Sequence, residues 1–406
     1  MDFNWIDGGV CAPKGFKANG IHCGIRKNKT KKDLALIVAD DLCNAAAVYT
    51  TNKVYGAPIT VTREHLKNGK AKAVICNSGN ANTCNADGVK KANLMAQLVE
   101  EHCGIKKDDV IVASTGVIGQ PLPIEPIADG MAKLVKGLAY DNSSDAAEAI
   151  MTTDTVKKEY ALSFVIDGKT VTIGAIAKGS GMIHPNMATL LCFVTTDVAI
   201  SCDMLNKALK EVVADTLNMV SIDGDTSTND MLCILASGKA GNKEITDDGN
   251  NYQIFKSALN QVLTKTSKAI AKDGEGATKL MECVVKNAKS KQLAKSVAKS
   301  VITSSLLKAA VFASDANWGR ILCAIGYAEG EFDINKIDVD ISSKNGCVVV
   351  CKNGAGVEFS EEKATAVLNC DEFTITVNMN DGSEQATAWG CDLTYDYVKI
   401  NADYRT

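Results

Sequence analysis

The chain has 406 residues, of which 46% are apolar and 23% charged, and its 44 Lys and Arg nearly balance its 48 Asp and Glu. This length predicts one large domain or two, and the composition is that of a soluble globular protein. We expect no nucleic-acid partner, because there is no basic arm or stripe, and no membrane span, because no apolar run approaches about 18 residues. The first residues lack the features of a signal peptide, which indicates a cytoplasmic protein.

Cysteine and histidine usage argues against a metal centre. The 15 cysteines are scattered without a CxxC pair, and there are only 4 histidines. Several cysteines, such as Cys76, Cys192 and Cys233, lie inside apolar runs. We therefore expect reduced thiols in the core and no bound metal.

Apolar patterning predicts short strands alternating with amphipathic helices. After residue 337 the pattern changes to mostly short strands, and the Asn-Gly and Asp-Gly pairs there predict hairpin turns. These features indicate an α/β protein, and no linker-like stretch marks a domain boundary. Strands are expected at 36–39, 73–77, 110–113, 171–176, 190–195, 231–236, 337–341, 347–351, 373–377 and 393–400, helices at 89–102, 127–135, 203–219, 255–271 and 294–312, and hairpin turns at 345–346 and 381–382.

Small polar loops follow several of the expected strands. The sequences NSGNAN at 77–82 and ASTGVIG at 113–119 are two of them. The glycine-flanked backbone at 113–119 can direct N–H groups at a developing oxyanion, and a plain strand-to-helix turn is the alternative. The small polar residues at 77–82 suit either a ligand-lined loop or an Asx-rich turn. The acidic stretch DGDTSTND at 223–230 lacks the sixth-position glycine and the later glutamate of a calcium loop, so we expect no calcium there.

The most informative segment is KGSGMIHPNMATLLCFVTTD at 178–197. A glycine-rich turn and Pro185 lead to Ala188-Thr189 and then to an apolar run. A threonine hydroxyl is a weak nucleophile, but a threonine freed at its N-terminus carries its own base, an α-amino group with a pKa of about 8. An ordinary strand-start threonine is the alternative for Thr189. Lys178, after an apolar run, is either a solvated strand end or a partner for a carboxylate.

Eight ordered segments together resemble the ornithine acetyltransferases, also called glutamate N-acetyltransferases, over nearly the whole chain. The resemblance implies an α/β sandwich in which β-sheets lie between layers of helices. It also implies a self-cleaving enzyme of the N-terminal-nucleophile type, with two intertwined chains. The segments are NSGNAN at 77–82, ASTGVIGQPLP at 113–123, TTDT at 152–155, KGSGMIHPNMATLL at 178–191, DGDTSTND at 223–230, DGEGATK at 273–279, FASDANWGR at 312–320 and NADYRT at 401–406.

The same resemblance implies the site residues. Thr189 would be the nucleophile, released by cleavage of the Ala188–Thr189 bond into an α chain, 1–188, and a β chain, 189–406. Thr115 and Gly116 would form the oxyanion hole. The positions that match the family's substrate-binding residues are Thr152, Lys178, Thr189, Glu275, Asn401 and Thr406.

The implied reaction moves an acetyl group from N-acetylornithine to glutamate through an acetyl ester on Thr189, in arginine biosynthesis. It needs no metal, nucleotide or prosthetic group, and the residues leave open whether acetyl-CoA also serves as donor. The family further suggests a heterotetramer of two α and two β chains. From charge complementarity, we expect Lys178 to bind a substrate carboxylate and Glu275 an ammonium group.

Two other classes of protein are weighed against this interpretation. An N-terminal-nucleophile hydrolase would use the same threonine and pass the acyl group to water; the full set of acetyltransferase segments, NADYRT above all, argues against it. A non-enzymatic binding protein would leave Thr189 inert and the chain whole.

Overall fold

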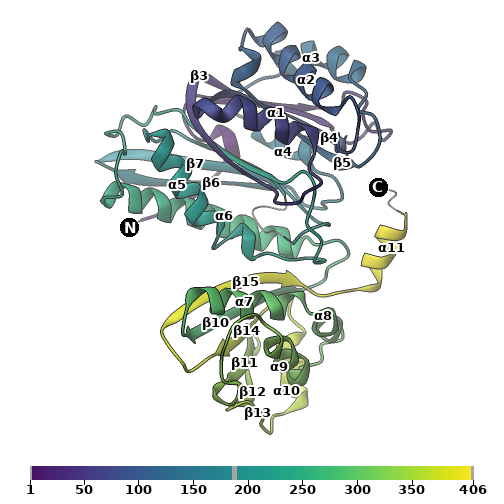
Figure 1. Ribbon diagram of the computed structural model, residues 1–406, viewed down its shortest axis with the longest axis vertical. Coiled ribbons are helices and arrows are strands. Elements are labelled where there is room, and N and C mark those ends of the chain that lie inside the picture. Colours follow the sequence, from purple (N-terminus) through teal and green to yellow (C-terminus); the bar gives the residue numbers. More distant parts are fainter. Residues whose placement is uncertain (1, 185–189, 404–406) are drawn as a thin grey trace.

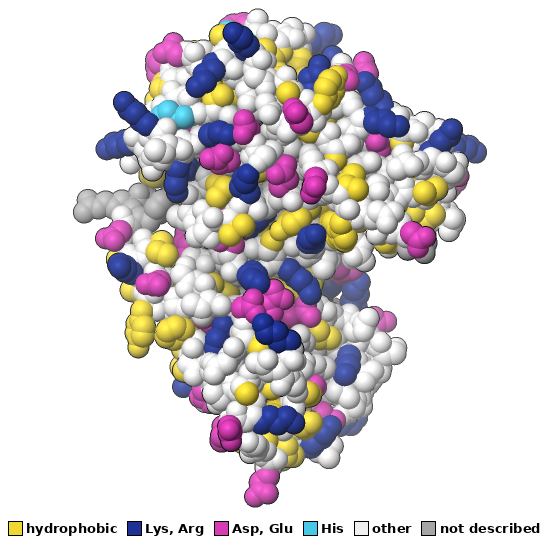
Figure 2. Space-filling view, turned by 180° about the vertical axis from the view of Figure 1, so that it is seen from behind, with side chains coloured by type: hydrophobic (Ala, Val, Ile, Leu, Met, Phe, Trp, Pro, Cys, Tyr) yellow, Lys and Arg dark blue, Asp and Glu magenta, His cyan; other side chains and the backbone are white. Residues whose placement is uncertain are grey.

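The computed structural model describes residues 2–184 and 190–403. The chain forms a larger lobe that contains the first nine strands and a smaller lobe that contains the later ones, and α11 projects beside the junction (Figure 1). On the face shown in Figure 2, acidic and basic side chains are interspersed over both lobes. Among the described residues, no helix is both long and apolar enough to cross a membrane.

The larger lobe is built on one nine-stranded sheet, in the order β1-β6-β7-β8-β9-β3-β4-β5, with β2 paired to β3. Every strand expected in this part of the sequence is present, and most are longer than expected because their polar ends also pair. The strands are β1 (Asn4–Ile6), β2 (Phe16–Ile21), β3 (Leu34–Tyr49), β4 (Lys70–Asn80), β5 (Val110–Val117), β6 (Lys158–Ile166), β7 (Lys169–Lys178), β8 (Leu191–Thr196) and β9 (Met231–Ala236).

The long strand β3 divides this sheet into two layers. Its first part pairs with β4 and its last part with β9, with a register shift between Val38 and Cys43. One buried cluster contains Ile37 of β3, Ile176 of β7 and Phe193 of β8, so the two halves of the sheet pack face to face.

Helices cover both outer faces. Side chains of α2 (Gly88–Cys103) and α3 (Glu125–Lys136) pack on β3, β4 and β5 together with α1 (Ala57–His65). On the other side, α5 (Cys202–Val213) and α6 (Asn250–Lys272) pack on β6 to β9. The result is a helix–sheet–sheet–helix sandwich, which confirms the predicted fold class. A further helix, α4 (Ser143–Ile150), buries its alanines against the inner cluster.

The smaller lobe is a six-stranded sheet in the order β13-β12-β11-β14-β10-β15. It is covered chiefly by α7, whose side chains join the same core cluster as those of β10 and β15. The elements are β10 (Leu280–Ala288), α7 (Lys291–Thr303), α8 (Ser305–Phe312), α9 (Trp318–Gly326), β11 (Asp338–Ser343), β12 (Gly346–Lys352), β13 (Ala355–Gly356), α10 (Glu361–Leu368), β14 (Glu372–Asn378) and β15 (Glu384–Cys391).

Four local predictions are wrong. The helix expected at 294–312 is two helices, because Ser304 has an extended backbone and its hydroxyl caps the second helix at Leu307. The helix expected at 203–219 ends at Val213, and a 3-10 turn follows at 217–219. The last expected strand, 393–400, is helix α11 (Tyr395–Asp403), which starts where the Thr394 hydroxyl accepts the N–H of Tyr397.

The fourth correction concerns the Asp-Gly pair at 381–382. The strands on either side of it, β14 and β15, do not pair with each other; both pair with β10, one parallel and one antiparallel. The connection therefore crosses the end of β10 and is no hairpin. The Asn-Gly pair at 345–346 does form the predicted hairpin, between β11 and β12.

The proposed chain boundary between Ala188 and Thr189 lies outside the described residues. The segments before and after it share one sheet, because β8 pairs with β7 on one side and with β9 on the other. β9 in turn pairs with β3 from the first segment. The described residues on the two sides of this boundary, 2–184 and 190–403, are thus intertwined and do not form separate lobes.

Candidate active site

The candidate site lies where β7 ends and β8 begins. Lys178 is the last residue of β7, in register with Leu191, and it is only 7% exposed. The alternative of a solvated strand end is therefore wrong. A buried ammonium group needs anionic neighbours, because removing a charge from water is costly.

The charges around Lys178 come from three separate segments of the chain. Burial and the positive charge of Lys158 lower its pKa, and the carboxylates of Asp154, Asp230 and Glu275 act in the opposite direction. Burial raises the pKa of the Cys76 thiol on β4, and the positive charge of Lys178 opposes this effect in part, so β4 lies near the ammonium group. The surroundings suit a cation that is available to an incoming anion.

Glu275 and Asn401 meet at this site although they are far apart in sequence. The side-chain amide of Asn401 donates to Glu275 Oε2 at 2.8 Å. The backbone N–H of Glu275 donates to the oxygen of Ser180 at 2.8 Å, two residues beyond Lys178. A Cβ on Gly181 would lie 2.3 Å from the Glu275 carboxyl carbon, so the glycine leaves room for this side chain. Helix α11 thereby reaches the site through Asn401.

Thr152 lies on another side of the site. Its backbone N–H donates to Asp154 Oδ2 at 3.0 Å, and Asp154 is one of the anions near Lys178. The structure therefore brings together four of the expected substrate-binding residues. They are Thr152, Lys178, Glu275 and Asn401.

Thr115 and Gly116 lie at the end of β5, in register with Ser78 and Gly79 of β4. Gly116 has a φ of +133°, and a Cβ there would lie 2.4 Å from the carbonyl carbon of Gly79. Only glycine fits this backbone. The segment expected as a turn is thus part of a strand over 113–117.

Asn229 links this strand end to β8 and was missed by the sequence analysis. Its amide donates to the backbone oxygens of Ala81 at 2.6 Å and Ser114 at 3.0 Å. Two residues later, the N–H of Met231 donates to the oxygen of Leu190 at 2.9 Å. These contacts join the strand end that carries Thr115 and Gly116 to the start of β8. The signal in the sequence that could have pointed to this residue is an Asn placed just before the expected strand at 231–236.

The nucleophile Thr189, the cleavage partner Ala188 and Thr406 lie outside the described residues. The described residues on either side are well anchored. The oxygen of His184 accepts the Thr226 hydroxyl at 2.9 Å, and the Asp223 carboxylate accepts the N–H groups of Met182 and Ile183. The acidic stretch at 223–230 therefore braces the segment before residue 185.

Within residues 2–184 and 190–403, no cluster of three or more His, Cys, Asp or Glu is arranged to hold an ion. All 15 cysteines are free thiols. His184 donates to or accepts from the Ser221 hydroxyl at 3.0 Å, and burial, with the charge of Lys299, lowers its pKa to about 4. His184 is therefore neutral near pH 7.

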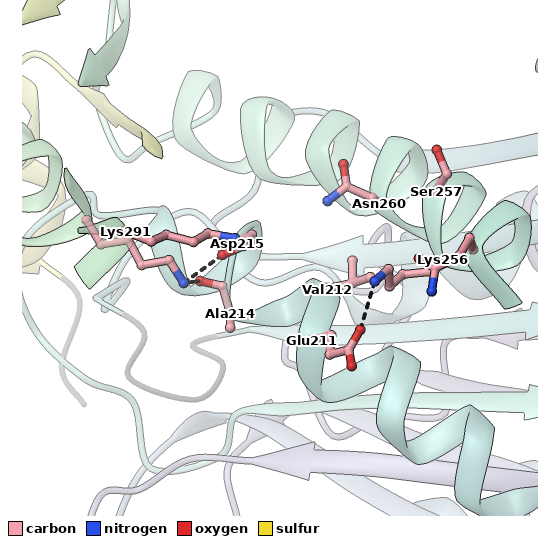
Figure 3. Close-up of a pocket in the computed structure, with 10 residues that line it drawn as sticks. Glu211, Val212, Ala214, Asp215, Lys256, Ser257, Asn260 and Lys291 are labelled. Carbon is pink, nitrogen blue, oxygen red and sulfur yellow. Dashed lines mark hydrogen bonds and ion pairs between the residues drawn. The ribbon is translucent and has the colours of Figure 1, made fainter. Parts of the chain in front are cut away.

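Two cavities lie away from Lys178. One, of about 610 Å³, is formed by α5, α6 and α7, and its lysines point at carboxylates, Lys256 at Glu211 and Lys291 at Asp215 (Figure 3). The other, of about 690 Å³, lies between the end of α6 and α11 and borders the Glu275 loop. Neither is lined by Lys178, Thr115 or Gly116.

Comparison with known proteins agrees with the resemblance in sequence. The ArgJ family model matches residues 17–406. An arginine biosynthesis bifunctional protein ArgJ 1 of Clostridium acetobutylicum is 53% identical over 392 residues, which cover 96% of both chains. The ArgJ of Symbiobacterium thermophilum is 49% identical over 404 residues, covering 99% of this chain and 100% of that one.

A similar solved structure carries the same family name. It is the crystal structure of the arginine biosynthesis bifunctional protein ArgJ of Bacillus halodurans, which is 46% identical with a TM-score of 0.50. The match covers 98% of that chain and 52% of this one. With a family match over nearly the whole length and relatives well above 30% identity, this chain belongs to the ArgJ family.

Proposed function

We propose that this ArgJ-family acyltransferase of arginine biosynthesis moves the acetyl group of N2-acetylornithine to glutamate through an ester on Thr189. The observation that carries the proposal is the meeting of buried Lys178 at the end of β7 with half-buried Glu275, which accepts the exposed side-chain amide of Asn401. This group offers a cation for the α-carboxylate of N2-acetylornithine and an anion for its side-chain ammonium group. Residue 189 begins the segment that leads into β8.

Self-cleavage comes first in this proposal. The Thr189 hydroxyl attacks the carbonyl carbon of Ala188, the C–N bond breaks, and water hydrolyses the resulting ester. The products are chains 1–188 and 189–406, with a free α-amine on Thr189. The solved Bacillus halodurans chain supports this step, because 98% of it matches only 52% of the present chain, close to the share of one cleaved piece.

Acetyl transfer follows in two displacements. The Thr189 α-amine takes the proton of its own hydroxyl as the oxygen attacks the acetyl carbonyl of N-acetylornithine. Donors from Thr115 and Gly116 stabilise the oxyanion, and losing one such donor typically costs about 3–4 kcal/mol. Ornithine leaves with the proton, and the amino group of glutamate then attacks the acetyl ester and restores the hydroxyl.

One pocket can serve both substrates because N-acetylornithine and glutamate each carry an α-carboxylate. Lys178 binds that carboxylate, and Glu275, held by Asn401, binds the side-chain ammonium group of ornithine. Thr152 and Thr406 complete the polar lining. No cofactor takes part. The relatives are named bifunctional proteins, which supports acetyl-CoA as a second donor and makes it the first alternative substrate to test.

We further propose that the working enzyme is cytoplasmic and is a heterotetramer of two α and two β chains. The exposed Tyr395 and Val398 of α11 leave apolar surface available for contact between copies. Analytical ultracentrifugation of the cleaved protein separates this assembly from a single α–β pair.

The experiment that tests the covalent step uses the purified protein and N-acetylornithine without an acceptor. Mass spectrometry should find one added acetyl group on the 189–406 chain, on the N-terminal threonine. Initial rates with both substrates varied should give parallel double-reciprocal lines. Intersecting lines and no trapped acetyl group would indicate direct transfer between two bound substrates.

A further inference from the structure

Asp154 lies in the turn between α4 and β6 and contacts its own turn, the first residue of β6 and the residue that follows β7. Its Oδ2 accepts the backbone N–H of Thr152 at 3.0 Å, and its Oδ1 accepts the backbone N–H of Gly179 at 2.7 Å. Oδ1 also accepts from Lys158 Nζ at 2.8 Å. The side chain of Asp154 has no exposed surface. A buried carboxylate with three donors is held in one position.

These contacts fix two of the proposed substrate-binding residues. Thr152 precedes Asp154 in the same turn, whereas Gly179 directly follows Lys178 at the end of β7. The two oxygens of one carboxylate therefore set the spacing between the Thr152 turn and the Lys178 backbone.

We propose that Asp154 is a positioning residue for substrate binding, which holds the backbone of Thr152 and of Gly179, next to Lys178, at a fixed spacing and supplies a negative charge for the buried ammonium group of Lys178. Asp154 itself touches no substrate. The inference rests on the proposed function, because it takes Lys178 as the partner of the substrate carboxylate.

The other charges near Lys178 do not replace Asp154. Asp230 is buried and its pKa is raised well above the ordinary value, which reduces its negative charge. Glu275 shares its carboxylate with Asn401. Lys158 is a second cation, and it opposes the charge of Lys178.

Asp154 has the properties that this role needs. Burial alone would raise its pKa, but Lys178 and Lys158 outweigh burial and lower it, so Asp154 is ionised throughout the working range. It is also the largest of the influences that raise the pKa of Lys178. Removing its charge therefore leaves burial and Lys158 to favour the neutral amine at Lys178.

The test is Asp154→Asn in the full, self-cleaved enzyme. Asparagine keeps an acceptor and the shape but loses the charge. KM for N-acetylornithine at about pH 8.5 should rise about tenfold, because a neutral amine binds a carboxylate less tightly than an ammonium group. It should return toward the wild-type value at about pH 6.5, as Lys178 regains its proton. A merely structural defect would raise KM equally at both pH values, which would overturn the inference.

Asp273→Asn is the matched control. Asp273 also contacts Lys158 Nζ, at 2.6 Å, but it is not among the main charges acting on Lys178. This variant removes a buried carboxylate from the same ionic cluster, and its KM should keep the wild-type pH dependence. If Asp273→Asn and Asp154→Asn shift the pH dependence alike, Asp154 has no special role.

Lys178→Gln separates this inference from the proposed function. KM should rise at every pH, and adding Asp154→Asn should raise it little further, because both changes remove one interaction. If Lys178→Gln leaves KM unchanged in an active enzyme, the role proposed for Lys178 is wrong. If Lys178→Gln raises KM and Asp154→Asn does not, only the inference on Asp154 is wrong.

Lys158→Gln carries the test with the opposite sign if Asp154→Asn does not fold. Loss of this cation removes a positive charge that disfavours the ammonium form of Lys178. KM at about pH 8.5 should therefore stay at or fall below the wild-type value. A rise in KM at that pH, reversed at lower pH, would contradict the inference.

Discussion

The side-chain amide of Asn229 donates to the backbone oxygen of Ser114 at 3.0 Å, and this bond ties the strand that carries Thr115 and Gly116 to the start of β9. The oxygen of the same amide accepts hydrogen bonds from the hydroxyls of Thr83 at 2.7 Å and Thr228 at 2.5 Å. Every polar atom of this buried side chain is thus used. A single residue joins the proposed oxyanion donors to the strand next to β8.

Asn229→Asp replaces two N–H donors by a carboxylate facing two carbonyl oxygens. The oxyanion donors should lose their exact alignment, so kcat should fall by about 100-fold while KM changes little. Steady-state kinetics of acetyl transfer measure this. Asn242→Asp is the control, because Asn242 also donates to two backbone oxygens, those of Ala199 and Lys243, but none of its bonds reaches a candidate site residue. It should lower stability by about 1–3 kcal/mol and leave kcat unchanged; equal loss of kcat in both variants would contradict the role of Asn229.

Deletion of residues 401–406 removes Asn401 and its bond to Glu275. Self-cleavage should continue, because it needs no external substrate. Transfer should fall about 100-fold, the scale of lost positioning. Denaturing gels and rate measurements on the same preparation compare the two activities. A truncated enzyme with wild-type transfer would show that the C-terminal residues form a surface end and lie outside the site.

Thr189→Ala removes both the proposed nucleophile and the proposed base. The variant should stay at full length and transfer no acetyl group, whereas the wild type should give pieces of roughly 20 and 23 kDa from 42.9 kDa. Sequencing of the larger piece should begin Thr189-Leu190. Thr195→Ala, in β8, is the control and should still be cleaved. A wild-type protein that remains whole would remove Thr189 as nucleophile.

His184 should make stability depend on pH. Its folded pKa of about 4 lies below the ordinary 6.5, because burial and Lys299 disfavour the charged ring and Asp225 opposes them only in part. Between these two values the unfolded chain binds more protons than the folded one, so the free energy of unfolding falls as pH drops through this window. Urea denaturation at about pH 7 and pH 5 should therefore show a smaller loss for His184→Gln than for the wild type. Equal losses would show that the ring is not buried in the neutral form.

The sequence predicted most of the strands and helices because apolar strands and amphipathic helices have distinct periods, whereas their layered arrangement was implied by the family resemblance. Prediction from the sequence failed where contacts between distant segments determine the local structure. The segment 393–400 has strand-forming residues, but the Thr394 hydroxyl caps it as a helix. Lys178 could not be recognised as buried because its counter-charge Asp154 is 24 residues away, on another element. Asn229 was missed for the same reason, since its partners lie on β5 and after β4.

The central claim is tested most directly by following a labelled acetyl group. The purified protein is incubated with N-acetylornithine, labelled in the acetyl carbonyl, in the presence and absence of glutamate. The account predicts label in N-acetylglutamate, equal in amount to the ornithine released, and no sustained turnover without glutamate. Release of labelled free acetate at the same rate with or without glutamate would contradict the account and identify a hydrolase.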